Sequence, residues 1–177
     1  MTESKPSHSM ISRRVAPCLT AFVIVVLMSG CSTCGTPRFS GLREAPKRLA
    51  PGAATFVVVL ARSQWTSTGV YARPGETYRF QGLPPDRWYD LIIVTNSCGY
   101  PSQSSIQRRA EKCRRVASAP WFALCASVEP TGTPFVLCGK SEVPIPARGE
   151  IGLFANDAPA AYWNNFGRLK VRITRLR

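Results

Sequence analysis

The chain has 177 residues, and its 23 lysines and arginines against 10 acidic residues give a formal net charge of +13. Its single histidine, His8, lies near the N-terminus, so the rest of the chain has no imidazole base or imidazole metal ligand. Carboxylates are also few, and no two of them stand in a close pair of the kind that hydrolytic sites use. We therefore expect the protein not to be an enzyme.

The first segment has the features of an export signal. Arg13 and Arg14 precede an uncharged run, residues 15–30, with the sequence VAPCLTAFVIVVLMSG. This run is shorter than the roughly 20 apolar residues that a membrane-spanning helix needs. A basic start followed by a short apolar run is typical of a signal peptide that is removed from the mature protein.

The end of this run resembles the lipobox of bacterial lipoproteins. Ser29 and Gly30 are small residues directly before Cys31, and in lipoproteins the signal is cut before such a cysteine, which then carries the lipid. The resemblance implies that residues 1–30 are a lipoprotein signal peptide and that Cys31 anchors the protein to the cell envelope. Ser32 in place of an aspartate favours the outer over the inner membrane. The alternative is an ordinary secretory signal.

Residues 31–53 are rich in Gly, Pro, Ser and basic groups, a composition that predicts a tether. Residues 54–177 are then long enough for one domain. A basic domain often binds nucleic acid, but an exported, lipid-anchored one meets anionic lipids and acidic glycans first. We expect a membrane and a glycan or anionic envelope polysaccharide as partners, and no nucleic acid. The plainer alternative is solvated surface charge.

The cysteines of the expected domain predict two disulfides, because the expected compartment is oxidising. Four cysteines allow three pairings. The segments WFALCASV and PFVLCG read as two strands of a hairpin, and a turn centred in EPTGTP places Cys125 opposite Cys138. This favours the pair Cys125–Cys138 and leaves Cys98–Cys113 as the second pair.

Strand signals dominate the domain, and a short basic segment, residues 104–118, is the one place where a helix is expected. The expected strands cover residues 55–61, 69–73, 77–82, 88–95, 121–128, 134–139, 142–147, 149–157 and 168–176. Short strands separated by turn residues predict an all-β fold, an antiparallel β-sandwich or jelly roll. Three tryptophans lie in or beside these strands and are expected in the core: Trp65, Trp88 and Trp121.

The last expected strand alternates between apolar and basic residues. Its apolar positions are Leu169, Val171 and Ile173, and its basic positions are Arg168, Lys170 and Arg172. This period of two predicts a half-buried antiparallel strand with a basic outer face.

The loop before that strand, NDAPAAYWNN at residues 156–165, is rich in oxygen donors. Asp157 offers a carboxylate, Asn164 and Asn165 offer amide oxygens, and Ala160–Ala161 offer backbone carbonyls. Calcium takes about 6–8 oxygen ligands of these kinds. The alternative is a simple turn, since Asn, Asp and Pro are common turn formers.

The segment GEIGLFANDAPAAYWNNFGRLKVRI resembles the closing segment of the calcium-dependent, galactose-binding bacterial lectins. The shared pattern is Asn156–Asp157, Tyr162, Asn164–Asn165 and Gly167, followed by a last strand. WTSTGVYARPGETYRFQG and DRWYD also resemble the early part of that fold, so the resemblance covers roughly residues 55–177. It implies a galactose-binding-domain-like β-sandwich.

The resemblance also implies a set of site residues. The calcium would be held by Asp157, the Ala161 carbonyl, Asn164, Asn165 and a carbonyl near Tyr89 or Asp90. In that family two sugar hydroxyls complete the calcium shell. The sugar ring would lie between Tyr162 and Trp163 and contact Asp157 and Asn165.

The sequence departs from the family at its second sugar-contacting loop, where the lectins use a His and a Gln. Residues 98–113 stand in its place, with no histidine and with Gln103 and Gln107 as candidates. The basic residues there favour anionic ligands such as uronic acids or lipopolysaccharide core sugars. The sequence thus predicts a lipoprotein with a lectin-like, calcium-dependent carbohydrate-binding module. The alternative is a structural envelope lipoprotein with the same sandwich and neither metal nor sugar.

Overall fold

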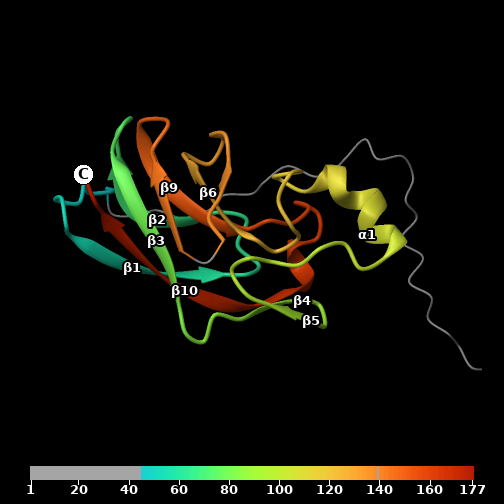
Figure 1. The fold of residues 1–177 in the computed structure, drawn as a ribbon. Coiled ribbons are helices and arrows are strands. Elements are labelled where there is room, and N and C mark those ends of the chain that lie inside the picture. Colours follow the sequence, from blue (N-terminus) through green and yellow to red (C-terminus); the bar gives the residue numbers. More distant parts are fainter. Residues whose placement is uncertain (1–44, 139) are drawn as a thin grey trace, which may run out of the picture. The chain divides into compact units, whose positions relative to one another are not determined.

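The computed structural model describes residues 45–138 and 140–177, and most of their regular structure is β (Figure 1). The strands are β1 (Ala54–Leu60), β2 (Thr66–Ala72), β3 (Thr77–Leu83), β4 (Trp88–Asp90), β5 (Ile93–Thr95), β6 (Leu124–Val128), β7 (Phe135–Val136), β8 (Lys140–Pro144), β9 (Gly149–Ala155) and β10 (Asn165–Arg175). The helices are α1 (Ser105–Ala110) and two 3-10 turns, η1 (Glu111–Cys113) and η2 (Tyr162–Asn164). In this described part no helix is long and apolar enough to span a membrane.

The strands form two antiparallel sheets, which confirms the predicted β-sandwich. The six-stranded sheet has the order β5-β4-β10-β3-β8, with β1 also paired to β10. The four-stranded sheet has the order β2-β9-β6-β7. The 11-residue β10 is the central strand, because it pairs with β4 near its start and with β1 and β3 further along.

The predicted alternation of the last strand is confirmed. Leu169, Val171 and Ile173 are fully buried, whereas Arg168, Lys170 and Arg172 are exposed. Successive side chains in a strand point to opposite faces, so one face of β10 packs into the sandwich and the other carries the cations.

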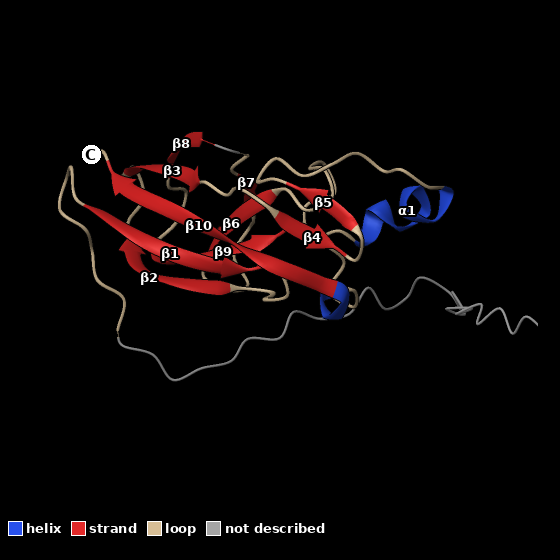
Figure 2. Cartoon of the chain, turned by 90° about the horizontal axis from the view of Figure 1, so that it is seen from below, coloured by secondary structure: helices blue, strands red, loops and turns tan. Residues whose placement is uncertain are grey.

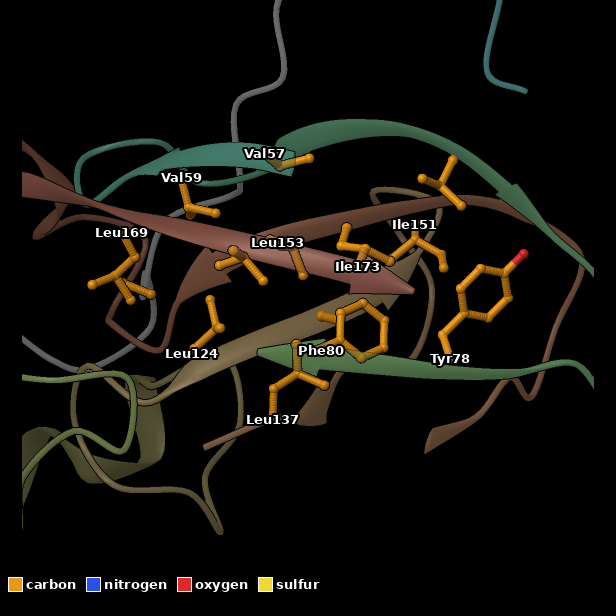
Figure 3. Close-up of a cluster of buried hydrophobic side chains, with 14 of the residues drawn as sticks. Val57, Val59, Tyr78, Phe80, Leu124, Leu137, Ile151, Leu153, Leu169 and Ile173 are labelled. Carbon is orange, nitrogen blue, oxygen red and sulfur yellow. The ribbon is translucent and has the colours of Figure 1, made fainter. Parts of the chain in front are cut away.

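The core lies between the two sheets (Figure 3). Its labelled side chains are Val57, Val59, Tyr78, Phe80, Leu124, Leu137, Ile151, Leu153, Leu169 and Ile173. Trp88 and Trp121 are buried as predicted, and Trp65 is partly buried. Cys31–Arg177 form one compact unit, and every residue of the core clusters falls after residue 48. A chain that begins at Cys31 therefore contains the whole core.

The strand expected over residues 88–95 is two strands. β4 and β5 pair as a hairpin, and Leu91 at its turn has a φ of 53°. Leu91, Ile92 and Val94, at and beside this turn, are exposed. Apolar composition alone does not distinguish a buried strand from an exposed hairpin tip.

The predicted disulfides are wrong. Cys98 is bonded to Cys138 rather than to Cys113, which is itself disulfide-bonded, and Cys125 is a free, buried thiol. The reason is the register: Cys125 lies opposite Val136, two positions short of the predicted partner. Cys138 follows the end of β7, where its φ of 29° takes it out of the strand.

The helix expected within residues 104–118 is shorter than that segment. α1 ends at Ala110, and the chain continues into the 3-10 turn η1. Ser104 caps the helix, since its side chain accepts a hydrogen bond from the Gln107 backbone N–H at 3.1 Å. Figures 1 and 2 both show α1 at the end of the sandwich where β4 and β5 lie.

Candidate metal and ligand site

The loop of residues 156–165 connects the two sheets. It leaves the four-stranded sheet at the end of β9 and enters the six-stranded sheet where β10 begins at Asn165. Asn165 is paired with Asp90, the last residue of β4. The pairing of β10 with β4 therefore brings the predicted residues of the loop and Asp90 to the same end of the sandwich.

Asn156 has a structural role. Its Nδ2 donates to the carbonyls of Val116, Ala119 and Pro120, and its Oδ1 accepts from the Val116 N–H at 2.9 Å. The nitrogen and the oxygen of this fully buried amide thus both hydrogen-bond to backbone groups. Asn156 fixes the segment 116–120 against the end of β9, and it is not available to a ligand.

Asp157 and Asn165 form a buried pair. Asn165 Nδ2 donates to Asp157 Oδ2 at 2.9 Å, and the Ala158 N–H donates to Asp157 Oδ1 at 2.7 Å. Asn165 Nδ2 also lies 3.4 Å from the carbonyl of Ala61. Each of the two residues is 1% exposed. The two residues predicted as metal ligands are therefore brought into direct contact.

Asn164 and Asp90 form a second pair beside the first. Asn164 Nδ2 is 3.4 Å from Asp90 Oδ1, and the hydroxyl of Tyr100 donates to Asp90 Oδ2. The Leu91 N–H donates to the Asn164 carbonyl at 3.2 Å, which ties the β4–β5 turn to the loop. Sequence reasoning expected a backbone carbonyl near Tyr89 or Asp90, whereas the structure directs the Asp90 carboxylate to the site.

The amide oxygens of both asparagines have no hydrogen-bond partner. Asn164 Oδ1 and Asn165 Oδ1 are buried and unpaired, although the nitrogens of the same amides are bonded. A buried acceptor without a partner costs about 1–3 kcal/mol. The Ala161 carbonyl accepts only the Asn164 N–H among the backbone hydrogen bonds, so a second lone pair remains. Oxygens that lack donors are the feature that a bound cation would satisfy.

The carboxylates of the site have raised pKa values. Burial raises the pKa of Asp157 to about 7, and the negative charge of Asp90 adds to the increase. Burial also raises the pKa of Asp90 above its usual value. Both carboxylates are therefore destabilised in their charged form, and a divalent cation between them would remove that penalty.

The donor set fits calcium better than a softer metal. Among the described residues no three His, Cys, Asp or Glu side chains gather in one place. The oxygens here are two carboxylates, two amides and a backbone carbonyl. Calcium accepts such mixed oxygen ligands, whereas zinc sites are built from Cys and His.

The two aromatic residues expected to contact the ligand differ in burial. Tyr162 is buried, and its hydroxyl donates to the carbonyl of Ala155. It therefore anchors η2 to the end of β9 rather than standing beside an open site. Trp163 is 78% exposed, so it is the aromatic side chain that a ligand can reach.

Tyr100 and Gln107 join the candidate site from the segment after β5. Gln107 Nε2 donates to the Tyr100 hydroxyl at 3.1 Å, and Tyr100 contacts Asp90. Gln107 Oε1 accepts the Gln103 N–H at 2.7 Å. From the sequence, Gln107 was predicted as a candidate sugar-contacting residue. Tyr100 was missed, because this residue stands in a Gly-Tyr-Pro stretch with no periodic pattern.

Comparison with protein families finds no match, and no curated protein matches the chain. A solved structure described as the EclA N-terminal domain, a PllA-like lectin, is similar to it. The likeness has a TM-score of 0.50 at 20% identity and covers 68% of this chain and 94% of that one. The chain has the fold of this domain. At this identity the likeness shows the fold alone.

Proposed function

We propose that this protein is a calcium-dependent carbohydrate-binding module carried by a lipid-anchored envelope protein. The observation that carries the proposal is the pair of buried, unpartnered oxygens, Asn164 Oδ1 and Asn165 Oδ1, beside the carboxylates of Asp157 and Asp90. The fold of a PllA-like lectin domain supports the same function, and so does the resemblance of the loop 156–165 to lectin sequences.

The burial of each residue determines from which side it would hold the cation. Asp157 and Asn165 are almost completely buried and would hold the cation from inside. Asn164 and Asp90 are partly exposed and would hold it from the solvent side. When bound, the calcium supplies open coordination positions that sugar hydroxyls can fill. Trp163 would then present an apolar wall to the ring.

The calcium proposal is tested by calorimetry on residues 31–177 with Cys31→Ser. We expect saturable calcium binding in this protein and at least tenfold weaker binding in Asp157→Asn. This substitution keeps the size of the side chain and one of the two oxygens that accept hydrogen bonds from Asn165 and Ala158, so the loop can still fold. The matched control is Asp86→Asn, because Asp86 is a second carboxylate that accepts hydrogen bonds, from Ser97, outside the loop.

Two results would contradict this proposal. The first is no heat of calcium binding in the parent protein, and the second is equal affinity in the parent and in Asp157→Asn. Either result would favour the structural envelope lipoprotein. If calcium binds, a glycan array screened with and without calcium identifies the sugar, and the basic composition of the chain favours acidic glycans.

The lipid anchor belongs to the proposal and is supported by the sequence before Cys31, which lies outside the described residues. Labelling of the full chain with a fatty-acid probe during expression in a bacterial host tests it. We expect label on the wild-type chain and none on Cys31→Ser. Label that persists in the variant would show that Cys31 is not the lipidated residue.

A further inference from the structure

One face of the six-stranded sheet exposes large apolar side chains. Phe56, Val58 and Leu60 are exposed on β1, and they point away from the core because the residues between them, Val57 and Val59, are buried. A second group is formed by Tyr89, Val94 and Phe166 on β4, β5 and β10. Leu91 and Ile92 extend this group at the hairpin tip. Exposed apolar patches of this kind mark interaction sites.

The strand registers put the two groups on the same face, which we call the outer face. Phe56 lies opposite Arg172, Val58 opposite Lys170 and Leu60 opposite Arg168. Phe166 lies opposite Tyr89, which in turn lies opposite Val94. Directly paired residues share a face of the sheet. Gly167 has a φ of 85°, but on both sides of it the even-numbered residues of β10 from Phe166 to Arg172 are exposed while Asn165 and Leu169 are buried. Figure 2 views the molecule from the side of β1, β10, β4 and β5.

A row of cations runs between the two apolar groups. Arg168, Lys170 and Arg172 follow one another along β10 on the outer face. Among the described residues none of the three forms an ion pair. Lys170 Nζ lies 5.0 Å from the centre of the Phe56 ring, so charge and apolar surface adjoin. The carboxylate of Glu142 on β8 is paired with Arg79 and does not neutralise the row.

We propose that the outer face docks on an anionic lipid bilayer. A bilayer offers phosphates for the cations and an apolar layer for the side chains beside them. A second copy of the chain fits worse, because a symmetric contact would place like-charged rows against each other. A purely polar polysaccharide would leave the apolar side chains in water. The inference goes beyond the proposed sugar site, because none of the candidate calcium ligands is among the residues of the outer face.

The length of the preceding segment is consistent with this docking. Thirteen residues, 32–44, separate the proposed lipidated residue, Cys31, from the first described one. Even fully extended they reach at most about 50 Å, so the proposed anchor would keep the domain close to the bilayer. A single lipid signal is commonly supported by a second, polybasic signal on the protein surface, and the outer face has the composition of such a signal.

The experiment measures vesicle binding of residues 31–177 carrying Cys31→Ser, so that no lipid anchor contributes. Vesicles of phosphatidylcholine with phosphatidylglycerol are compared with vesicles of phosphatidylcholine alone, in the presence of a chelator. We expect sedimentation with the anionic vesicles only and release by high salt. The variant Phe56→Thr, Lys170→Gln, Arg172→Gln is expected to bind at least about tenfold more weakly.

The matched control is Ile106→Thr, Arg108→Gln, Arg109→Gln on α1. It removes one exposed apolar side chain and two exposed cations, as the test variant does, but away from the outer face. Equal losses of vesicle binding in both variants would mean that net charge alone explains the binding, which would overturn the proposal. The absence of binding to anionic vesicles would overturn it too. Binding by Asp157→Asn in the chelator should equal that of the parent, so failure of the calcium site and failure of the docking face are separate results.

Discussion

At the scale of single residues, the charge state of Asp157 decides the behaviour of the site. Its pKa of about 7 lies above the usual value of 3.8 because the side chain is buried. The folded state without metal therefore binds the proton more tightly than the unfolded state does. The contribution of Asp157 to the free energy of unfolding is complete below about pH 4, falls as the pH rises and is lost above about pH 7.

We therefore expect the calcium-free protein to lose stability between about pH 4 and pH 7, by on the order of a few kcal/mol. The measurement is the urea midpoint as a function of pH in a chelator, for the parent and for Asp157→Asn. The difference between the two curves isolates this carboxyl from other titrating groups. Parallel curves across this range would contradict the raised pKa of Asp157.

Calcium affinity should show the opposite dependence on pH. Calcium binds the carboxylate and not the protonated acid, so protons compete for Asp157 below its pKa. We expect binding about tenfold weaker or more at about pH 5 than at about pH 8. Calorimetry at the two pH values measures this ratio. A constant affinity would show that Asp157 is not a ligand.

The sequence predicted the site residues within the loop 156–165 better than those that come from β4 and from the segment after β5. Asp157, Asn164 and Asn165 are neighbours in one short segment, so a motif can identify them. The Asp90 carboxylate and Tyr100 reach the same place only through the pairing of β4 with β10. No local pattern records that pairing.

At the scale of elements, the disulfide between Cys98 and Cys138 ties the segment after β5 to the end of β7. It closes a loop of 40 residues, and a loop of this size limits the unfolded chain enough to contribute about 2–4 kcal/mol. We expect the variant Cys98→Ser, Cys138→Ser to lose about 2–4 kcal/mol of unfolding free energy, and therefore to unfold at a lower denaturant concentration. Cys125→Ala, which removes the free thiol, is the control and should cost less. An unchanged midpoint in the double variant would contradict the assignment.

The strand patterns in the sequence predicted most of the strands. The errors were the register of the β6–β7 hairpin and the turn within residues 88–95. β10 was predictable because basic and apolar residues alternate from Arg168 to Ile173, and exposed and buried positions follow this alternation. The Cys125–Cys138 prediction failed through a shift of two residues in a hairpin whose second strand, β7, has only two residues. The turn within residues 88–95 was missed because LIIV, residues 91–94, is a run of apolar residues without a Gly, Pro or Asn that would mark a turn.

At the scale of the whole molecule, the candidate site lies where the two sheets are joined. Asp157 follows β9 of the four-stranded sheet, whereas Asn165 and Asp90 belong to the six-stranded sheet. A cation held by all three would link the sheets through metal–oxygen bonds. Since β9 and β10 both contribute to the core, separation of the sheets at this end would expose that core. Calcium should therefore stabilise the global fold and not only the loop.

The expected size of this effect follows from mass action. A ligand that binds only the folded state adds about 2.7 kcal/mol at a free concentration of 100 times its Kd. We expect calcium to raise the melting temperature of the parent protein with this concentration dependence. At the same calcium concentration it should raise that of Asp157→Asn less, because this variant binds calcium at least tenfold more weakly. The same titration followed by amide hydrogen exchange separates two cases. Protection that increases in β6 and β9 as well as in residues 156–165 means that the cation links the sheets, whereas protection confined to the loop would contradict that role.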